Sequence, residues 1–260
     1  MKVAVISNPS THSGKSSFIT VLSTVFAKTQ NKDVSLFSTE DMSDYLESVT
    51  VHDKPEGAQS ISVYTAMMRN GQLKGEEYYD YANNIGDGRV YAFNLFGSKL
   101  ARHEQEELFE KTFKYVDSEL ELVEVKGDIN DPFNMRVIDS CNIVLFIMNT
   151  SNEEFKYLKV LKDALTEDTF KRMGIVIQKY DDKVISEKTI SKRTGIAIRN
   201  MLIMNYCPVV QKLALKGEQD SIADLIISGH PEVANMRVRI QEVMKYLFEN
   251  IRGISEWHHS

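Results

Sequence analysis

Cysteine and long apolar segments are scarce in this sequence of 260 residues. The two cysteines, Cys141 and Cys207, each lie in a largely apolar stretch, which favours buried thiols in a reducing compartment over a disulfide or a metal pair. The longest apolar run extends only from Ile143 to Met148. A membrane-spanning helix needs roughly 20 such residues, so the sequence predicts no transmembrane segment.

Positive charge is also in deficit. Lysine and arginine number 31 against 37 aspartates and glutamates, for a formal net charge of −6. This balance disfavours a general nucleic-acid-binding surface. The first apolar run covers only Val3 to Ile6 before polar residues follow, which is unlike a signal peptide. We therefore expect a cytoplasmic globular protein, long enough to bury a large core without a metal or a disulfide.

Short apolar strands alternate with amphipathic helices along most of the chain. The strands are expected at residues 3–6, 34–37, 90–96, 120–125, 143–148 and 174–177, and the helices at 18–26, 61–84, 104–116, 135–139, 153–164 and 232–251. Residues 185–194 mix helix and loop, and residues 196–202 show no clear pattern. Such alternation predicts one α/β domain over residues 1–260, a three-layer, mostly parallel sheet with helices on both faces.

The segment between the first strand and the first helix carries a phosphate-binding pattern. Gly14 is followed by Lys15 and Ser16 at the start of the helix. There the backbone N–H groups and the helix dipole favour an anion, the lysine reaches phosphates, and the serine hydroxyl ligates Mg²⁺. Pro9 replaces the first glycine of the usual motif. We expect a nucleotide site, with a plain strand-to-helix turn as the alternative.

The loop residues resemble the ParA/MinD group of P-loop ATPases, and most closely its TadZ/CpaE branch. The segment that corresponds to the group's modified phosphate loop is Ser10, Thr11, His12, Ser13, Gly14, Lys15, Ser16 and Ser17. The resemblance implies that these residues bind ATP or ADP with Mg²⁺. In the group, a lysine at the position of Ser10 reaches the partner's phosphates in a homodimer. His12 either touches a phosphate or faces solvent.

The resemblance also places acidic residues around the nucleotide. The position of the water-activating aspartate falls on Ser38, and Glu40 or Asp41 could substitute for it. The resemblance thus implies Lys15 and Glu40 as catalytic residues. Either Glu124 or Asp128 takes the Mg²⁺ role beside Ser16.

Two further stretches resemble the segments that contact the nucleotide base in this group. Gln178 and Lys179 follow an apolar strand, and Pro208 lies in a later loop. A glutamine side chain donates and accepts hydrogen bonds as an asparagine does. The resemblance implies that these three residues flank the adenine.

The resemblance implies a nucleotide-dependent dimerisation switch with weak ATPase activity. The switch would position a partner protein of a membrane-associated pilus, secretion or conjugation complex, and partners would recruit it to the membrane or cell pole. A catalytically inactive nucleotide-binding scaffold is one alternative. A DNA-partitioning ATPase is another, for which the basic cluster of Lys188, Lys192, Arg193 and Arg199 would neutralise phosphates. A solvated helix face accounts for the same cluster.

Overall fold

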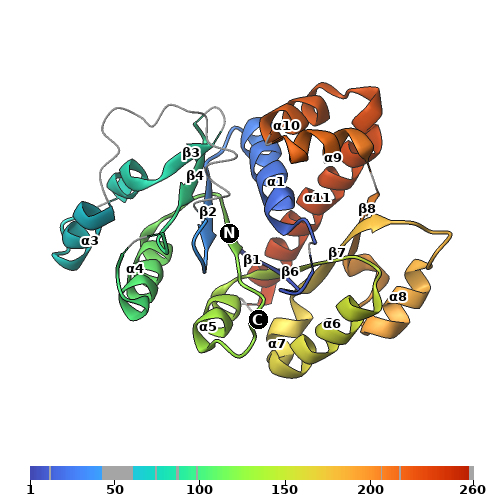
Figure 1. Cartoon of the computed structure of the whole chain (residues 1–260), viewed down its shortest axis with the longest axis horizontal. Coiled ribbons are helices and arrows are strands. Elements are labelled where there is room, and N and C mark those ends of the chain that lie inside the picture. Colours follow the sequence, from blue (N-terminus) through green and yellow to red (C-terminus); the bar gives the residue numbers. More distant parts are fainter. Residues whose placement is uncertain are drawn as a thin grey trace.

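A single eight-stranded sheet organises the chain (Figure 1). The computed structural model describes residues 1–11, 13–42, 61–73, 75–85, 88–97, 99–205, 207–216 and 218–257. The strands lie in the order β3-β4-β2-β5-β1-β6-β7-β8. Every neighbouring pair is parallel except β3 and β4. The expected α/β architecture is confirmed.

The strands are β1 (Lys2–Ser7), β2 (Val34–Ser38), β3 (Asn83–Ile85), β4 (Val90–Phe93), β5 (Leu120–Glu124), β6 (Ile143–Met148), β7 (Met173–Tyr180) and β8 (Met201–Asn205). The helices are α1 (Lys15–Gln30), α3 (Ile61–Arg69), α4 (Arg102–Tyr115), α5 (Pro132–Ser140), α6 (Asn152–Ala164), α7 (Glu167–Lys171), α8 (Glu187–Thr194), α9 (Pro208–Leu215), α10 (Gln219–Ser228) and α11 (Ala234–Trp257). Short 3₁₀ turns are η1 (Gly75–Tyr81), η2 (Ile198–Asn200) and η3 (Pro231–Val233).

Helices cover both faces of the sheet and form two apolar cores. Successive strand side chains point to opposite faces. On β6, Val144 and Phe146 join the core beneath α4, α5, α6 and α8, whereas Ile143 and Leu145 join the core beneath α1, α10 and α11. Because both faces of β6 are buried, its sequence is apolar throughout rather than alternating.

The segment after residue 60 departs from the expectation of one helix over residues 61–84. Helix α3 ends at Arg69, and Gly71 follows with φ +63°. A 3₁₀ turn and the antiparallel strand β3 then occupy residues 75–85. Tyr64 and Tyr78 of this segment are buried in the core.

The last third of the chain contains more structure than its sequence pattern indicated. Residues 196–202 lead into β8, a parallel edge strand rich in methionine, and α7, α9 and α10 were not expected. Helix α11 packs on the sheet through Ile240, Val243 and Leu247, as expected. Both cysteines are free thiols, and Cys141 is buried. None of the helices in the described ranges combines the length and apolarity needed to cross a bilayer.

Candidate nucleotide-binding site

The segment between β1 and α1 folds into a tight loop at the carboxyl end of the central strand. Asn8 organises it, because its side-chain oxygen accepts a hydrogen bond from the Ser10 amide at 3.0 Å and its carbonyl accepts one from the Thr11 amide at 3.2 Å. Gly14 precedes the helix with φ +74°, a conformation that favours glycine. Gly14 has no side chain to cap the helix, so the first N–H groups of α1 are available for an anion.

The loop forms one wall of a cavity of about 450 Å³. The opposite wall comes from the ends of β5, which pairs with β1, and of β2, which pairs with β5 on its other side. The described residues that line the cavity are Ser7, Asn8, Pro9, Thr11, Ser13, Gly14, Lys15, Ser16, Ser17, Glu40, Glu124, Lys126 and Gly127. Most of the expected loop residues therefore surround one space, while His12 lies outside the described residues.

Ser16, Lys15 and Glu124 meet inside this cavity. The Ser16 hydroxyl donates a hydrogen bond to Oε1 of Glu124 at 2.6 Å, and Nζ of Lys15 lies 3.6 Å from the same oxygen. Nζ of Lys15 also donates to the carbonyl of Val125 at 2.8 Å. Both charged side chains are about nine-tenths buried. Adjacent hydroxyl and carboxylate oxygens are the donor set that Mg²⁺ takes beside phosphates, so these residues fit the ion.

Asp128, the other candidate for the Mg²⁺ role, occupies a turn beyond the cavity lining. Its Oδ1 accepts a hydrogen bond from the Asn130 amide at 3.0 Å, and its carbonyl accepts one from the Asn134 side chain at 3.1 Å. The structure therefore brings Glu124, rather than Asp128, next to Ser16. Among the described residues, no group of three or more His, Cys, Asp or Glu side chains is arranged to hold a metal.

Glu40 lies at the mouth of the cavity opposite Lys126, a residue that the sequence analysis did not select. Nζ of Lys126 is 3.8 Å from Oε2 of Glu40, and its amide donates to the Thr39 hydroxyl at 2.9 Å. Ser38 is buried at the end of β2, and its hydroxyl accepts a hydrogen bond from the Glu40 amide at 3.2 Å. The position of Lys126, two residues after the end of β5, is the sequence signal that would have found it.

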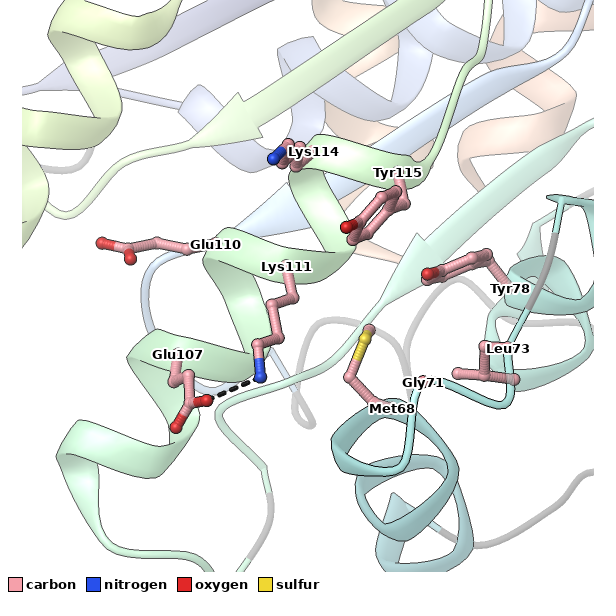
Figure 2. A pocket seen from close by; sticks show the side chains of 9 residues that line it. All are labelled: Met68, Gly71, Leu73, Tyr78, Glu107, Glu110, Lys111, Lys114 and Tyr115. Atoms are coloured by element: carbon pink, nitrogen blue, oxygen red, sulfur yellow. Dashed lines mark hydrogen bonds and ion pairs between the residues drawn. The ribbon is translucent and has the colours of Figure 1, made fainter.

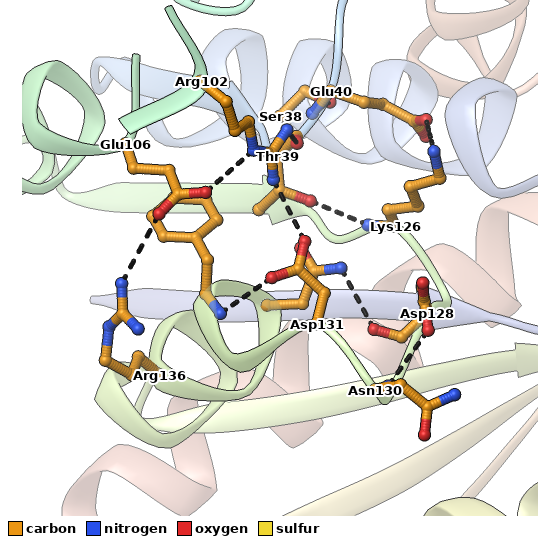
Figure 3. Close-up of polar contacts among 12 residues, drawn as sticks. Ser38, Thr39, Glu40, Arg102, Glu106, Lys126, Asp128, Asn130, Asp131 and Arg136 are labelled. Atoms are coloured by element: carbon orange, nitrogen blue, oxygen red, sulfur yellow. Dashed lines mark hydrogen bonds and ion pairs between the residues drawn. The ribbon is translucent and has the colours of Figure 1, made fainter. Parts of the chain in front are cut away.

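A polar network extends from this mouth to the surface helices α4 and α5 (Figure 3). Arg102 donates to the Thr39 carbonyl at 3.4 Å and to Asp131 at 3.1 Å, and it pairs with Glu106 at 2.8 Å. Thr39 in turn donates its amide to the Glu124 carbonyl at 3.1 Å. The loops after β2 and β5 are thus tied to each other and to the site.

Glu154 is a second residue that sequence reasoning missed. It lies in the first turn of α6 with no exposed surface, and its Oε1 accepts a hydrogen bond from the Thr11 hydroxyl at 2.6 Å. Its Oε2 has no hydrogen-bond partner among the described residues. Burial raises the pKa of this carboxyl. The buried carboxyl of Glu154 therefore holds the phosphate loop in place through its hydrogen bond with Thr11.

The three residues expected near the base have different surroundings. Nε2 of Gln178 lies 3.4 Å from the Gly14 carbonyl, so it contacts the phosphate loop. Lys179 follows with φ +54° at a bulge in the pairing of β7 with β8. Pro208 is exposed and begins helix α9. It is not among the described residues that line the cavity.

A larger cavity of about 700 Å³ lies elsewhere, between α3, η1 and α4 (Figure 2). Its apolar wall includes Met68 and Leu73, and Tyr78 stacks on Tyr115 at 5.9 Å between ring centroids. Its rim is balanced in charge, with Lys111 paired to a neighbouring glutamate. The loop cavity is therefore distinguished by its chemistry and not by its size.

Comparison with known proteins relates the whole chain to one structural group. A ParA family ATPase from Chlorobium tepidum TLS superposes with a TM-score of 0.66 at 13% identity, covering 90% of this chain and 95% of that chain. The cell division protein MinD of Aquifex aeolicus gives 0.62 at 15% identity, with 94% and 98% coverage. A putative plasmid partition protein of Borrelia burgdorferi B31, solved with AMPPNP, gives 0.58 at 12% identity, with 84% and 90% coverage. No family model and no curated protein sequence matches the chain. The fold is that of the ParA/MinD P-loop NTPases.

Proposed function

We propose that this chain binds ATP with Mg²⁺ and acts as a nucleotide-dependent dimerisation switch that positions or assembles a partner complex. The observation that carries the proposal is the contact of Ser16 with Glu124 beside Lys15, at the uncapped start of α1. Likeness in fold to ParA and MinD ATPases supports the same reading.

Each residue has a distinct role in this proposal. The N–H groups at the start of α1 bind phosphate oxygens, and Lys15 exchanges its contacts with Val125 and Glu124 for the outer phosphates. Ser16 and Glu124 would hold Mg²⁺, which neutralises phosphate charge when bound. The loops after β2 and β5 then reorganise around the terminal phosphate, because Glu40 and Lys126 both line the cavity.

Titration calorimetry with Mg-ATP tests the nucleotide site. Lys15→Ala is expected to weaken binding by about 100-fold or more, which corresponds to about 3 kcal/mol. Lys32→Ala serves as the matched control, because Lys32 is exposed beyond the end of α1 and pairs only loosely with Glu119 at 3.8 Å. Equal ATP affinity in Lys15→Ala and wild type would remove the proposal.

The dimer and the partner are tested separately. Light scattering with and without ATP measures whether mass doubles on nucleotide binding. The finer assignment to pilus, secretion or conjugation machinery follows from the sequence resemblance to the TadZ/CpaE branch, and recovery of such a complex with the ATP-bound chain would support it. In this proposal the protein is cytoplasmic and reaches the membrane through its partner.

A second candidate function is a nucleotide-binding scaffold without hydrolysis. The sequence resemblance puts Ser38 where the ParA/MinD group has its water-activating aspartate, and Glu40 is paired with Lys126. A general base must reach the attacking water and take up its proton, and a serine hydroxyl does not replace a carboxylate in that role. Phosphate release by the purified chain, alone and with a partner, separates the two candidates.

A further inference from the structure

Two side chains of α6, one turn apart, contact the two loops that enclose the nucleotide-site cavity. The Oε1 atom of Glu154 accepts a hydrogen bond from the Thr11 hydroxyl in the phosphate loop at 2.6 Å. The hydroxyl of Tyr157 donates a hydrogen bond to the Gly127 carbonyl in the loop that follows β5. The ring of Tyr157 stacks on Phe146 of β6, with 5.9 Å between the ring centroids, which fixes the place of the hydroxyl. Because residues three apart lie on the same side of a helix, one face of α6 holds both loops.

The two loops also lie directly against each other. Gly127 is buried, in the stretch between Lys126 and Asp128 that Figure 3 shows. A Cβ added at Gly127 would collide with the Ser7 carbonyl oxygen and would lie 2.7 Å from Cδ of Pro9. Only glycine allows the backbones to approach this closely. The phosphate loop, α6 and the loop after β5 are therefore in contact pairwise, and a shift of one loop is transmitted to the other.

Both contacts lie close in the chain to the groups that would bind the nucleotide. Lys15 follows Thr11 in the phosphate loop, on one wall of the cavity. Gly127 follows Glu124 and Val125, which contact Lys15 from the other wall. The spacing of the two loops therefore sets the distance between Lys15 and Glu124. A displacement of about 1 Å between groups that must act on one ligand is enough to weaken their joint action strongly.

The carboxyl of Glu154 is not explained by folding stability. Glu154 has no exposed surface, and its Oε2 has no hydrogen-bond partner in the described part of the chain. A buried polar atom without a hydrogen bond costs free energy. The Thr11 hydroxyl also lies 3.2 Å from the Asn8 carbonyl, so it would keep an acceptor without Glu154. An apolar side chain of similar length would therefore serve folding at least as well as the carboxyl does.

We propose that Glu154 and Tyr157 are positioning residues of the nucleotide site. They hold the phosphate loop and the loop after β5 at the spacing at which Lys15 and Glu124 act on one nucleotide. This inference rests on the function proposed above. Neither side chain is among the described residues that line the cavity, so each acts through the loop that it contacts. Supporting side chains of this kind determine how precisely a binding group is placed.

Calorimetry with Mg-ATP and urea denaturation of the same variants test the role of Glu154. Glu154→Met removes the acceptor and is expected to weaken ATP binding about five-fold or more, while the free energy of unfolding stays equal or rises. Glu154→Gln can still accept the hydrogen bond from Thr11 and should restore the affinity to within about two-fold of the wild type. Glu153→Met, at the exposed neighbouring position of α6, is the matched control and should leave the affinity unchanged.

Tyr157→Phe tests the second contact, because it keeps the ring on Phe146 and removes only the hydroxyl. It is expected to weaken ATP binding about three-fold. Tyr115→Phe, at an exposed position in the other cavity, is its control. The effects of Glu154→Met and Tyr157→Phe should not add in the double variant, because both contacts hold the same pair of loops. If Glu154→Met fails to fold, Tyr157→Phe and Glu154→Gln with Tyr157→Phe provide the test.

Hydrogen–deuterium exchange without nucleotide measures the loops themselves. In Glu154→Met the amides of residues 8–11 should exchange about three-fold faster or more, while those of β6 keep their rate. Wild-type ATP affinity in both Glu154→Met and Tyr157→Phe, an equal loss in the control variants, or a loss of affinity that only follows a loss of unfolding free energy overturns the inference. If Lys15→Ala binds ATP as the wild type does, the proposed function is wrong and this inference with it. If Lys15→Ala loses ATP and the α6 variants keep it, only this inference is wrong.

Discussion

The Ser16 hydroxyl and the Glu124 carboxylate are joined by a 2.6 Å hydrogen bond across two strands of the sheet. Ser16 belongs to the first turn of α1, and Glu124 is the last residue of β5. The contact arises because β1 and β5 are parallel neighbours with Val5 opposite Glu124. Sheet register thus places a carboxylate from one strand beside the helix that follows the other.

Replacement of Glu124 by glutamine is expected to remove the benefit of Mg²⁺ for ATP binding. The amide keeps the size and the contact with Ser16 but loses the charge that attracts the ion. The affinity for ATP in the presence of Mg²⁺ should fall at least tenfold, while the affinity in EDTA changes little or rises. Calorimetry in the two buffers measures both values.

Asp128→Asn is the matched control for this experiment, since it removes one carboxylate a short distance along the same loop. Among the described residues, its side-chain oxygen accepts a hydrogen bond from the Asn130 amide, a role that asparagine retains. Mg-ATP affinity should therefore match that of the wild type. If Asp128→Asn loses the Mg²⁺ effect and Glu124→Gln keeps it, the ion belongs with Asp128.

Local sequence patterns predicted the phosphate loop, whereas the other residues of the site are brought there by long-range packing. The loop before Lys15 is recognisable because a β-branched strand, a glycine and a helix start are contiguous. The places of Lys126 and Glu154 depend on which strands and helices become neighbours, information that no local window contains. The contact of Thr11 with Glu154 joins residues 143 positions apart.

The errors in secondary structure have the same origin. Strand β8 has the sequence MLIMN, in which a single residue is β-branched, so propensity alone does not mark it. It becomes a strand because the exposed edge of β7 pairs with it. Helix α3 ends at Arg69 because Gly71 adopts a positive φ. The sequence pattern alone did not indicate that this glycine would end the helix.

Gly14→Ala is expected to damage both stability and ATP binding. Alanine at this position would have to adopt φ +74°, and its Cβ would lie 3.1 Å from Oε1 of Gln178. Gly71→Ala is the matched control, because Gly71 has φ +63° with nothing within 4 Å of the added carbon. Each should lose about 1 kcal/mol of unfolding free energy from backbone strain, measured by urea denaturation. Only Gly14→Ala should also weaken ATP binding, and equal affinities in the two variants would contradict this.

Glu121, which is buried beside the partly exposed Lys2, predicts a pH dependence of stability. Burial raises the pKa of Glu121 from 4.5 to about 7, although Lys2 at 3.3 Å and the N-terminal amino group oppose this rise and Asp117 adds to it. Between these two values the native state retains a proton that the unfolded chain has released. Stability contributed by this group therefore falls as pH rises from about 4.5 to about 7.

Glu121→Gln should remove this dependence, because an amide does not titrate. Relative to the variant, the wild type is expected to lose on the order of 2–3 kcal/mol over that pH interval. Urea denaturation of both proteins across the interval measures the difference, in which contributions common to both cancel. A constant difference at all pH values would show that Glu121 titrates normally.

Lys126 is expected to contribute to phosphate binding from the far wall of the cavity. The cavity contains two lysine–glutamate pairs, Lys15 with Glu124 at 3.6 Å and Lys126 with Glu40 at 3.8 Å. The second pair is about half exposed, so its interaction is worth about 1 kcal/mol or less. An incoming polyphosphate carries more charge than one glutamate and competes for Lys126 at little cost.

Two substitutions should therefore act in opposite directions. Lys126→Ala removes a cation and is expected to weaken the binding of ATP about five-fold. The binding of ADP should weaken less, because ADP carries less charge. Glu40→Gln removes the anion that competes for Lys126 and should strengthen the binding of ATP up to about five-fold. Lys126→Arg, which keeps the charge, is the control for Lys126→Ala.

Calorimetry with both nucleotides measures these affinities. The effects of the two substitutions on affinity should not add in the double variant, because Lys126 and Glu40 form one pair. Weaker ATP binding by Glu40→Gln would instead indicate that Glu40 itself contacts the bound nucleotide or its metal.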